Sequence, residues 1–156
     1  MELKKEITRD LIIVLAMLVI LGLYFIIFPK NCKYNETCFN NAQSICKPAK
    51  FNSYQDGNLF EYRIIGQQAQ DCIISLKLSK VSNSYSLELK NSFEGKDMVC
   101  TINRNQLKIS PIQETSNLLS YCTGPLKEAT LEFMIKRLYG AIAQKFGAII
   151  KEIQSK

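Results

Sequence analysis

The hydrophobic and polar positions of this chain follow four successive patterns, of which the first is a long apolar run. Residues 11–28 read LIIVLAMLVILGLYFIIF, eighteen uncharged and almost wholly apolar positions between Asp10 and Pro29. As a helix that rises about 1.5 Å per residue, the run would be roughly 27 Å long, which nearly matches the hydrocarbon thickness of a bilayer. The pattern therefore predicts a transmembrane helix over 11–28, with a tail at 1–10 and a tether at 29–34.

Two features of this region argue against a cleaved leader. The apolar run is longer than the hydrophobic region of a usual signal peptide, and no small-residue cleavage motif follows it. The residues before Cys32 do not form a lipoprotein box, since they are Phe28, Pro29, Lys30 and Asn31. Positive residues are almost balanced on the two sides of the run, so charge alone does not orient it.

The second pattern is a short helical stripe that follows the tether. Asn35 is a candidate N-cap, and Pro48 limits how far a helix that starts there can extend. We therefore predict a helix over about 36–46. Its inner stripe would consist of Cys38, Ala42, Ile45 and Cys46.

From Phe51 the chain alternates between apolar and polar positions, which is typical of strands with one buried face. Four such segments predict four strands between about 58 and 104. The inward positions would be Phe60, Tyr62 and Ile64; Cys72, Ile74, Leu76 and Leu78; Tyr85, Leu87 and Leu89; and Met98, Cys100 and Ile102. Short turns favour an antiparallel meander with one solvated face and one face that needs a cover.

The fourth pattern is a helical stripe in residues 125–156. Pro125 suits a first helical turn, and no proline follows it. Apolar residues recur at spacings of 4, 3, 4, 4, 3 and 4, at positions 131, 135, 138, 142, 146, 149 and 153. Part of the stripe is expected to cover the sheet, but a helix of roughly 43 Å should also project beyond it.

The projecting half of this helix carries lysines beside its apolar positions. Such a helix can lie on an anionic membrane surface, or it can pair with another helix through the apolar stripe. A protein partner, or self-association through the C-terminal helix, is the favoured interpretation.

The six cysteines are best explained as disulfides. They are Cys32, Cys38, Cys46, Cys72, Cys100 and Cys122. Zinc sites usually use closely spaced cysteine pairs or histidines, and redox sites use Cys-x-x-Cys, but the sequence has no histidine and no such pair. An even set in a domain of this size is typical of proteins outside the cytoplasm, although a thermophilic archaeal cytosol also permits disulfides. We expect three bridges, and neither a metal nor a cofactor.

Local geometry restricts how these cysteines can pair. Cys38 and Cys46 would stand about 12 Å apart along the predicted helix, too far for a bridge whose α-carbons are about 4.4 to 6.8 Å apart. Cys72 and Cys100 would lie on strands separated by a third strand. Each of the four should therefore pair with a cysteine of another element, and the connectivity stays open.

Together, these patterns predict an α+β protein of the cell membrane with a single span. A disulfide-linked domain over 35–124 would lie outside the cytoplasm and contain one short helix and a four-stranded antiparallel sheet. The long amphipathic helix of 125–156 would follow it, and residues 1–10 would form a cytoplasmic tail. Asn35 begins the sequon NET, which makes it a candidate glycosylation site in such a location.

Composition and charge exclude more functions than they suggest. The 156 residues have a formal net charge of +6, but the sequence has no concentrated basic patch, so no nucleic-acid partner is expected. The sequence also has no Gly-x-Ser-x-Gly and no phosphate loop. Asp56, Asp71 and Asp97 lie beside predicted turns, where carboxylates usually serve as caps. We therefore expect that the protein is not an enzyme.

The run CFNNAQSICKPAKF resembles the beginning of a group of small membrane-anchored or secreted proteins of archaea and bacteria. The shared frame is Cys-Phe followed by Cys-x-Pro-Ala, and it corresponds here to Cys38-Phe39 and Cys46-Lys47-Pro48-Ala49. The match covers about 32–51. The resemblance implies a disulfide-linked helix close to a membrane, and it implies no catalytic or ligand-binding residue.

The leading interpretation is a single-pass envelope protein whose extracytoplasmic domain is a binding, interaction or structural module. The order of anchor, tether and domain supports it. A pilin-like filament subunit is an alternative, but Asp10 occupies the position where pilin processing needs a small residue. An accessory subunit of a larger membrane complex is a further alternative, and an enzyme is the least favoured class.

Overall fold

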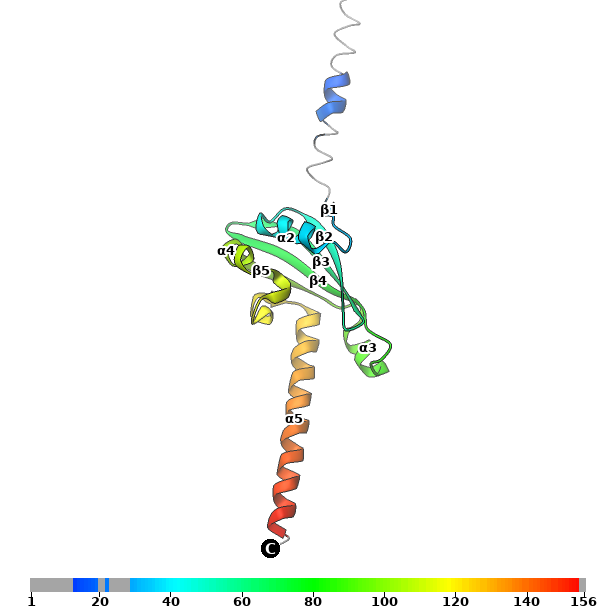
Figure 1. Cartoon of the computed structure of the whole chain (residues 1–156), viewed down its shortest axis with the longest axis vertical. Helices are drawn as coiled ribbons and strands as arrows, with labels where there is room; N and C mark the ends of the chain where they lie inside the picture. Colours follow the sequence, from blue (N-terminus) through cyan, green and yellow to red (C-terminus); the bar gives the residue numbers. More distant parts are fainter. Residues whose placement is uncertain (1–12, 20–21, 23–28, 155–156) are drawn as a thin grey trace, which may run out of the picture.

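The computed structural model describes residues 13–19, 22 and 29–154 (Figure 1). Residues 13–19 are helical. Within this described part of the chain, no helix is both long enough and apolar enough to cross a bilayer, so the transmembrane helix predicted over 11–28 is not found among these residues. The predicted tail at 1–10 and most of the other positions of the apolar run lie outside the described residues.

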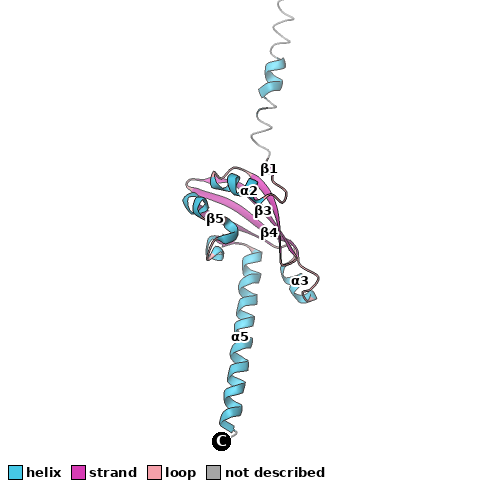
Figure 2. Ribbon diagram, in the orientation of Figure 1, coloured by secondary structure: helices cyan, strands magenta, loops and turns pink. Residues whose placement is uncertain are grey.

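In the part of the chain that the structure describes, six strands form one mixed sheet, and each pairs with the next in sequence (Figures 1 and 2). The strands are β1 (Lys30–Asn31), β2 (Ala49–Gln55), β3 (Asn58–Gln68), β4 (Asp71–Lys80), β5 (Asp97–Asn103) and β6 (Cys122–Thr123). β1 and β2 are parallel, and the other pairs are antiparallel. The protein is therefore α+β, but the predicted sheet of four antiparallel strands is wrong.

The hairpin between β2 and β3 follows from the chemistry of its turn. Asp56 and Gly57 join the strands with φ angles of 52° and 77°, the left-handed values that a two-residue turn needs to match the twist of paired strands. Gly57 is also required by space, because a Cβ there would lie 2.9 Å from the Ser82 hydroxyl oxygen. Farther along β3, the register with β4 shifts next to Gly66, which bends the hairpin.

The segment predicted as a third strand, with Tyr85, Leu87 and Leu89 inward, forms a helix instead. Helix α3 (Leu87–Phe93) begins after Ser86, whose hydroxyl accepts a hydrogen bond from the Leu89 amide at 3.4 Å. Leu87 is 73% exposed rather than buried. The alternation was misleading because so short an apolar segment fits a helical period as well as a strand period.

This helix is an insertion in the connection between β4 and β5, which pair with each other directly. Ile74 stands opposite Cys100, and Cys72 stands opposite Ile102. The expectation that a third strand separates Cys72 from Cys100 was therefore wrong. The predicted inward residues of the other three segments do face the core, and all are buried except Phe60, which packs against it half-buried.

Helices cover the inner face of the sheet. Helix α2 (Glu36–Ser44) inserts the fully buried Phe39, whose ring stacks on Phe51 with centroids 5.2 Å apart. The other covering elements are α4 (Arg104–Ile109) and the two 3-10 turns η1 (Ile112–Glu114) and η2 (Leu118–Tyr121). The helix predicted over 36–46 ends two residues earlier, at Ser44, because Cys46 adopts a left-handed φ of 53°.

The C-terminal helix α5 (Pro125–Gln154) has 30 residues. Its beginning packs on the domain, where Leu126 and Ala129 are buried, and it then runs away from the sheet (Figure 1). At about 1.5 Å per residue, its length is roughly 45 Å. The position and length of this helix thus agree with the pattern of the sequence.

Candidate functional site

All six cysteines form disulfides: Cys32–Cys38, Cys46–Cys72 and Cys100–Cys122. Disulfide bonding, which the cysteine pattern predicted, is confirmed. Cys32–Cys38 joins the segment after β1 to the first turn of α2. Cys46–Cys72 joins the end of α2 to β4, and Cys100–Cys122 joins the neighbouring strands β5 and β6. The cysteines therefore attach covering elements and an edge strand to the sheet.

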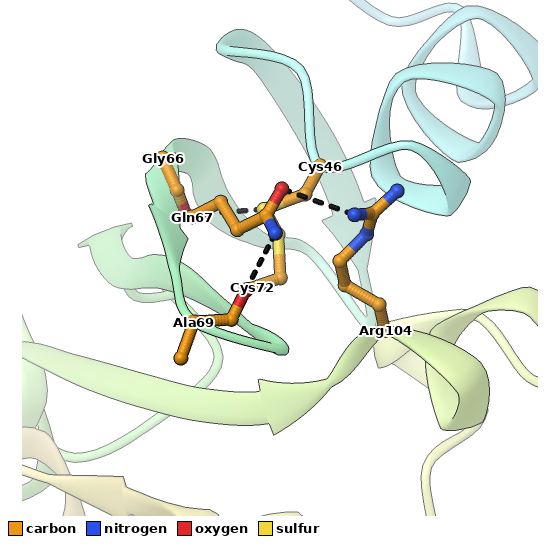
Figure 3. The surroundings of a disulfide bond; sticks show 6 residues. All are labelled: Cys46, Gly66, Gln67, Ala69, Cys72 and Arg104. Atoms are coloured by element: carbon orange, nitrogen blue, oxygen red, sulfur yellow. Dashed lines mark hydrogen bonds between the residues drawn. A yellow bond between two sulfur atoms is a disulfide. The ribbon is translucent and has the colours of Figure 1, made fainter.

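A small polar hollow is lined in part by Gln67, Ala69 and Arg104. Figure 3 shows these three residues around the Cys46–Cys72 disulfide. Gln67 organises the wall of this hollow, since its Nε2 donates to the Ala69 carbonyl at 2.6 Å and its Oε1 accepts from Arg104 Nη1 at 3.1 Å (Figure 3). Cys46 Sγ lies 3.0 Å from the Gly66 carbonyl oxygen. This contact is not a hydrogen bond, because a disulfide sulfur carries no proton. These contacts connect the β3–β4 turn to α4, and they give the hollow of about 230 Å³ a structural role.

The three aspartates that the sequence placed beside turns have structural positions. Asp56 forms the β2–β3 turn, Asp71 begins β4 and accepts a hydrogen bond from Asn103 Nδ2 at 3.3 Å, and Asp97 begins β5. Among the residues that the structure describes, no three cysteine, aspartate or glutamate side chains are grouped so that they could hold a metal ion.

Asn35, the candidate glycosylation site, is exposed and caps α2. Its Oδ1 accepts a hydrogen bond from the Cys38 amide at 2.9 Å. The side-chain nitrogen, to which a glycan would be attached, takes no part in this cap.

A groove opens where α5 leaves the sheet. We call it the basal groove, and it consists of two hollows of about 810 Å³ and 340 Å³ that share Leu78, Phe93, Thr130 and Met134. Volumes of this size are common in ligand pockets, but such pockets also contain a few polar groups that orient a ligand. The larger hollow offers only Asn117, Ser120 and Thr130 among mostly apolar side chains. The groove is therefore an apolar surface without a recognisable catalytic arrangement.

One wall of the basal groove is an aromatic contact between α3 and α5. The rings of Phe93 and Phe133 meet edge to face with centroids 5.8 Å apart, and the Arg137 guanidinium lies 5.0 Å from the Phe133 centroid. One turn away, Lys136 Nζ and Glu132 Oε1 form an exposed ion pair at 3.0 Å. The hydrogen bond from Lys136 and its positive charge lower the pKa of Glu132, and the same contact raises the pKa of Lys136.

Beyond its base, α5 presents an apolar surface to solvent. Four side chains, which we call the outer stripe, are between 41% and 61% exposed: Leu131, Ile135, Leu138 and Ile142. At about 100° per residue, this stripe lies on the side of the helix opposite the buried Leu126 and Ala129. The expectation that part of this stripe covers the sheet was therefore wrong, because α5 packs on the domain with its other side.

The sequence did not point to the basal groove, because its walls come from elements far apart in the chain. Met134 and Thr130 are positions of α5 that the apolar spacing did not select. The only local signal was the pair Leu118 and Leu119 after the last predicted strand, and both side chains line the groove.

Comparison with the models of known protein families found no match, and comparisons with curated proteins and with solved structures found none either. The resemblance carried by Cys38-Phe39 and Cys46-Lys47-Pro48-Ala49 is not tested by these comparisons. Function must be argued from the geometry of the chain itself.

Proposed function

We propose that this chain is a non-catalytic interaction module of an oxidising compartment outside the cytoplasm, and that α5 is the element with which it binds a protein partner. The observation that carries the proposal is the exposure of the outer stripe on the side of α5 that faces away from the domain. A helix that only completed the fold would direct its apolar side chains toward the sheet.

The physical reason is that a projecting helix has little stability of its own. Most of the stability of a helix in a protein comes from packing of its apolar side, and this contribution is missing where α5 leaves the domain. Gly140 weakens the projecting part further, since a glycine inside a helix costs about 1 kcal/mol relative to alanine. Covering the four half-exposed side chains of the outer stripe would contribute on the order of 4 kcal/mol. A partner helix therefore stabilises what the domain leaves uncovered.

The disulfides support the proposed location in an oxidising compartment. Three bridges within one small domain are expected where thiols are oxidised, and they are rare in a reducing cytosol. The exposed side-chain nitrogen of Asn35 is compatible with the same location.

Site-specific photo-crosslinking in intact cells tests the proposal. A photoreactive p-benzoylphenylalanine replaces Leu138 of the outer stripe in one variant, and it replaces Ile109 of α4 in the matched control. Ile109 is an apolar residue of α4 that is 87% exposed. We expect a discrete protein adduct from position 138 and none from position 109. Absence of an adduct at 138, or equal adducts at both positions, would overturn the proposal.

A further inference from the structure

We propose that the basal groove binds the hydrocarbon chain of a free fatty acid and leaves the carboxylate of this ligand in solvent. The inference goes beyond the proposed role of α5, because it does not use the outer stripe. Three features carry it: the core is open at this place, the polar side chains of the groove are already hydrogen-bonded within the protein, and the two hollows adjoin.

The hydrophobic core is incompletely closed at the basal groove. Under α2 and η1 the cover is complete, since Phe39 and Ile112 are fully buried. At the groove, four side chains pack against the core while only half-buried, and all four line the larger hollow: Phe60, Phe93, Leu118 and Leu119. An apolar ligand in this place would remove their remaining surface from water and thus complete the core.

The polar side chains of the groove leave a ligand few free groups. Thr130 Oγ1 donates to the Leu126 carbonyl at 2.8 Å, and Ser120 Oγ donates to a backbone carbonyl three residues earlier at 2.8 Å. Asn58 Oδ1 accepts from the Ser82 amide at 2.9 Å. Among the described residues that line the two hollows, none is charged. A sugar, a nucleotide or an extended peptide would therefore lose hydrogen bonds on entering, whereas a hydrocarbon chain has none to lose.

The two hollows adjoin at the base of α5. Both are lined by Leu78, Phe93, Thr130 and Met134. From these shared residues, the larger hollow reaches Leu119 of η2 and the smaller one reaches Val81 after β4. Figure 1 shows the yellow segment that contains η2 on one side of the base of α5, and α3 on the other. The groove therefore extends across the base of this helix, which suits an extended chain.

The lining also suits a flexible ligand with one chain. Met98 of β5 and Met134 of α5 both line the larger hollow. Methionine side chains are unbranched and adapt to apolar ligands of different shape. A lipid with two chains would have to leave the bilayer and expose its second chain to water, which is unfavourable for every methylene group exposed. A fatty acid, which has a single chain, avoids this cost.

Photoaffinity labelling of the purified full chain tests the inference. The probe is palmitic acid with a diazirine near the end of its chain, and the protein is kept in digitonin, a detergent without an alkyl chain that could fill the groove. We expect label on the peptide that contains Leu118 and Leu119, and competition by unlabelled palmitic acid. No label on this peptide, or label that palmitic acid does not displace, would overturn the inference.

Two neighbouring positions of α5 provide the variant and its matched control. Met134 and Ile135 are both 53% exposed, but only Met134 lines the groove. Met134→Glu should lower the label on the Leu118–Leu119 peptide at least about tenfold, because it places a carboxylate against the chain of the ligand. Ile135→Glu should leave the label unchanged. Circular dichroism and intact disulfides would show that both variants are folded, and equal labelling of the two variants would overturn the inference.

A second probe identifies the source of the chain. It carries the same diazirine on one chain of a phosphatidylcholine, which is presented in a bilayer nanodisc that contains the protein. Label on the Leu118–Leu119 peptide from the fatty acid alone supports the inference, whereas equal or stronger label from the phospholipid would overturn it. None of these results depends on the photo-crosslink from position 138, which tests the proposed function separately.

Discussion

Phe93 of α3 and Phe133 of α5 meet edge to face, with their ring centroids 5.8 Å apart and their planes at 86°. This contact joins the insertion between β4 and β5 to the base of the projecting helix. Phe93 also packs against the hydrophobic core and lines the basal groove. The segment that the sequence pattern misassigned as a strand thus helps to set the direction in which α5 leaves the domain.

Phe93→Ala should therefore loosen the base of α5. We expect a loss of about 2 kcal/mol in the free energy of unfolding, because Phe93 is only half-buried and its edge-to-face contact with Phe133 adds to the lost burial. Amide exchange in α5 should accelerate. The matched control is Leu87→Ala, which shortens an exposed side chain of the same helix and should change stability little. Equal effects of the two variants would contradict the role of the aromatic contact.

The three disulfides should differ in their contributions to stability. They link residues 26, 22 and 6 positions apart, in the order Cys46–Cys72, Cys100–Cys122 and Cys32–Cys38. In the chain-entropy model, a longer closed loop restricts the unfolded chain more, so removal should cost about 3.5 kcal/mol for each of the longer loops and about 2 kcal/mol for the short one. Three variants test this order, and in each of them both cysteines of one bridge are replaced by alanine. Urea unfolding measures the free energy of unfolding that each variant loses. A larger loss for Cys32–Cys38 than for Cys46–Cys72 would contradict it.

Gly124, just before α5, should not tolerate a side chain. Its φ of +124° is unfavourable for any other residue, and a Cβ would lie 3.0 Å from the Asp97 carbonyl oxygen and 3.1 Å from Met98 Cα. Both neighbours are backbone atoms, so Gly124→Ala should cost about 1 to 3 kcal/mol. The matched control Gly140→Ala lies inside α5 with no atom within 4 Å of the added Cβ, and it should stabilise the helix by up to about 1 kcal/mol. If Gly124→Ala left the free energy of unfolding unchanged, the backbone at this junction would be able to shift, which would contradict the prediction.

Stability should fall at alkaline pH as Tyr62 ionises. Burial of its phenol, the main cause, raises the pKa of Tyr62 to about 12, against 10.0 for an exposed tyrosine. The folded state thus favours the neutral phenol. The raised pKa of Tyr62 contributes roughly 2 to 3 kcal/mol to the free energy of unfolding. This contribution is complete below pH 10 and is lost progressively between pH 10 and about 12. Tyr62→Phe cannot ionise and should flatten this part of the stability curve. The exposed Tyr85→Phe should leave the curve unchanged, and a parallel decline in both variants would contradict the assignment.

The sequence by itself determined the elements whose signals are local. Asn35 sets the beginning of α2 because an N-cap acts on neighbouring backbone groups. The alternation in β3, β4 and β5 identified the buried side of the sheet, because the side-chain period of a strand is two residues wherever it pairs. Six cysteines without histidine indicated disulfides from the chemistry of the residues alone.

The tertiary structure decided what depends on contacts between distant segments. β1 and β6 are too short to show an alternation, and they exist as strands because β2 and β5 offer them free edges. Residues 87–93 became a helix because β4 and β5 pair directly and leave no place for a strand.

The side of α5 that packs on the domain was decided in the same way. Its apolar spacing shows that a stripe exists but not what covers it. Phe93, Leu126 and Phe133 settle the packing on the other side, since the helix can bury only one of its sides against this small sheet. Contacts with other segments therefore decide that the outer stripe is exposed, and the sequence of α5 alone does not predict this.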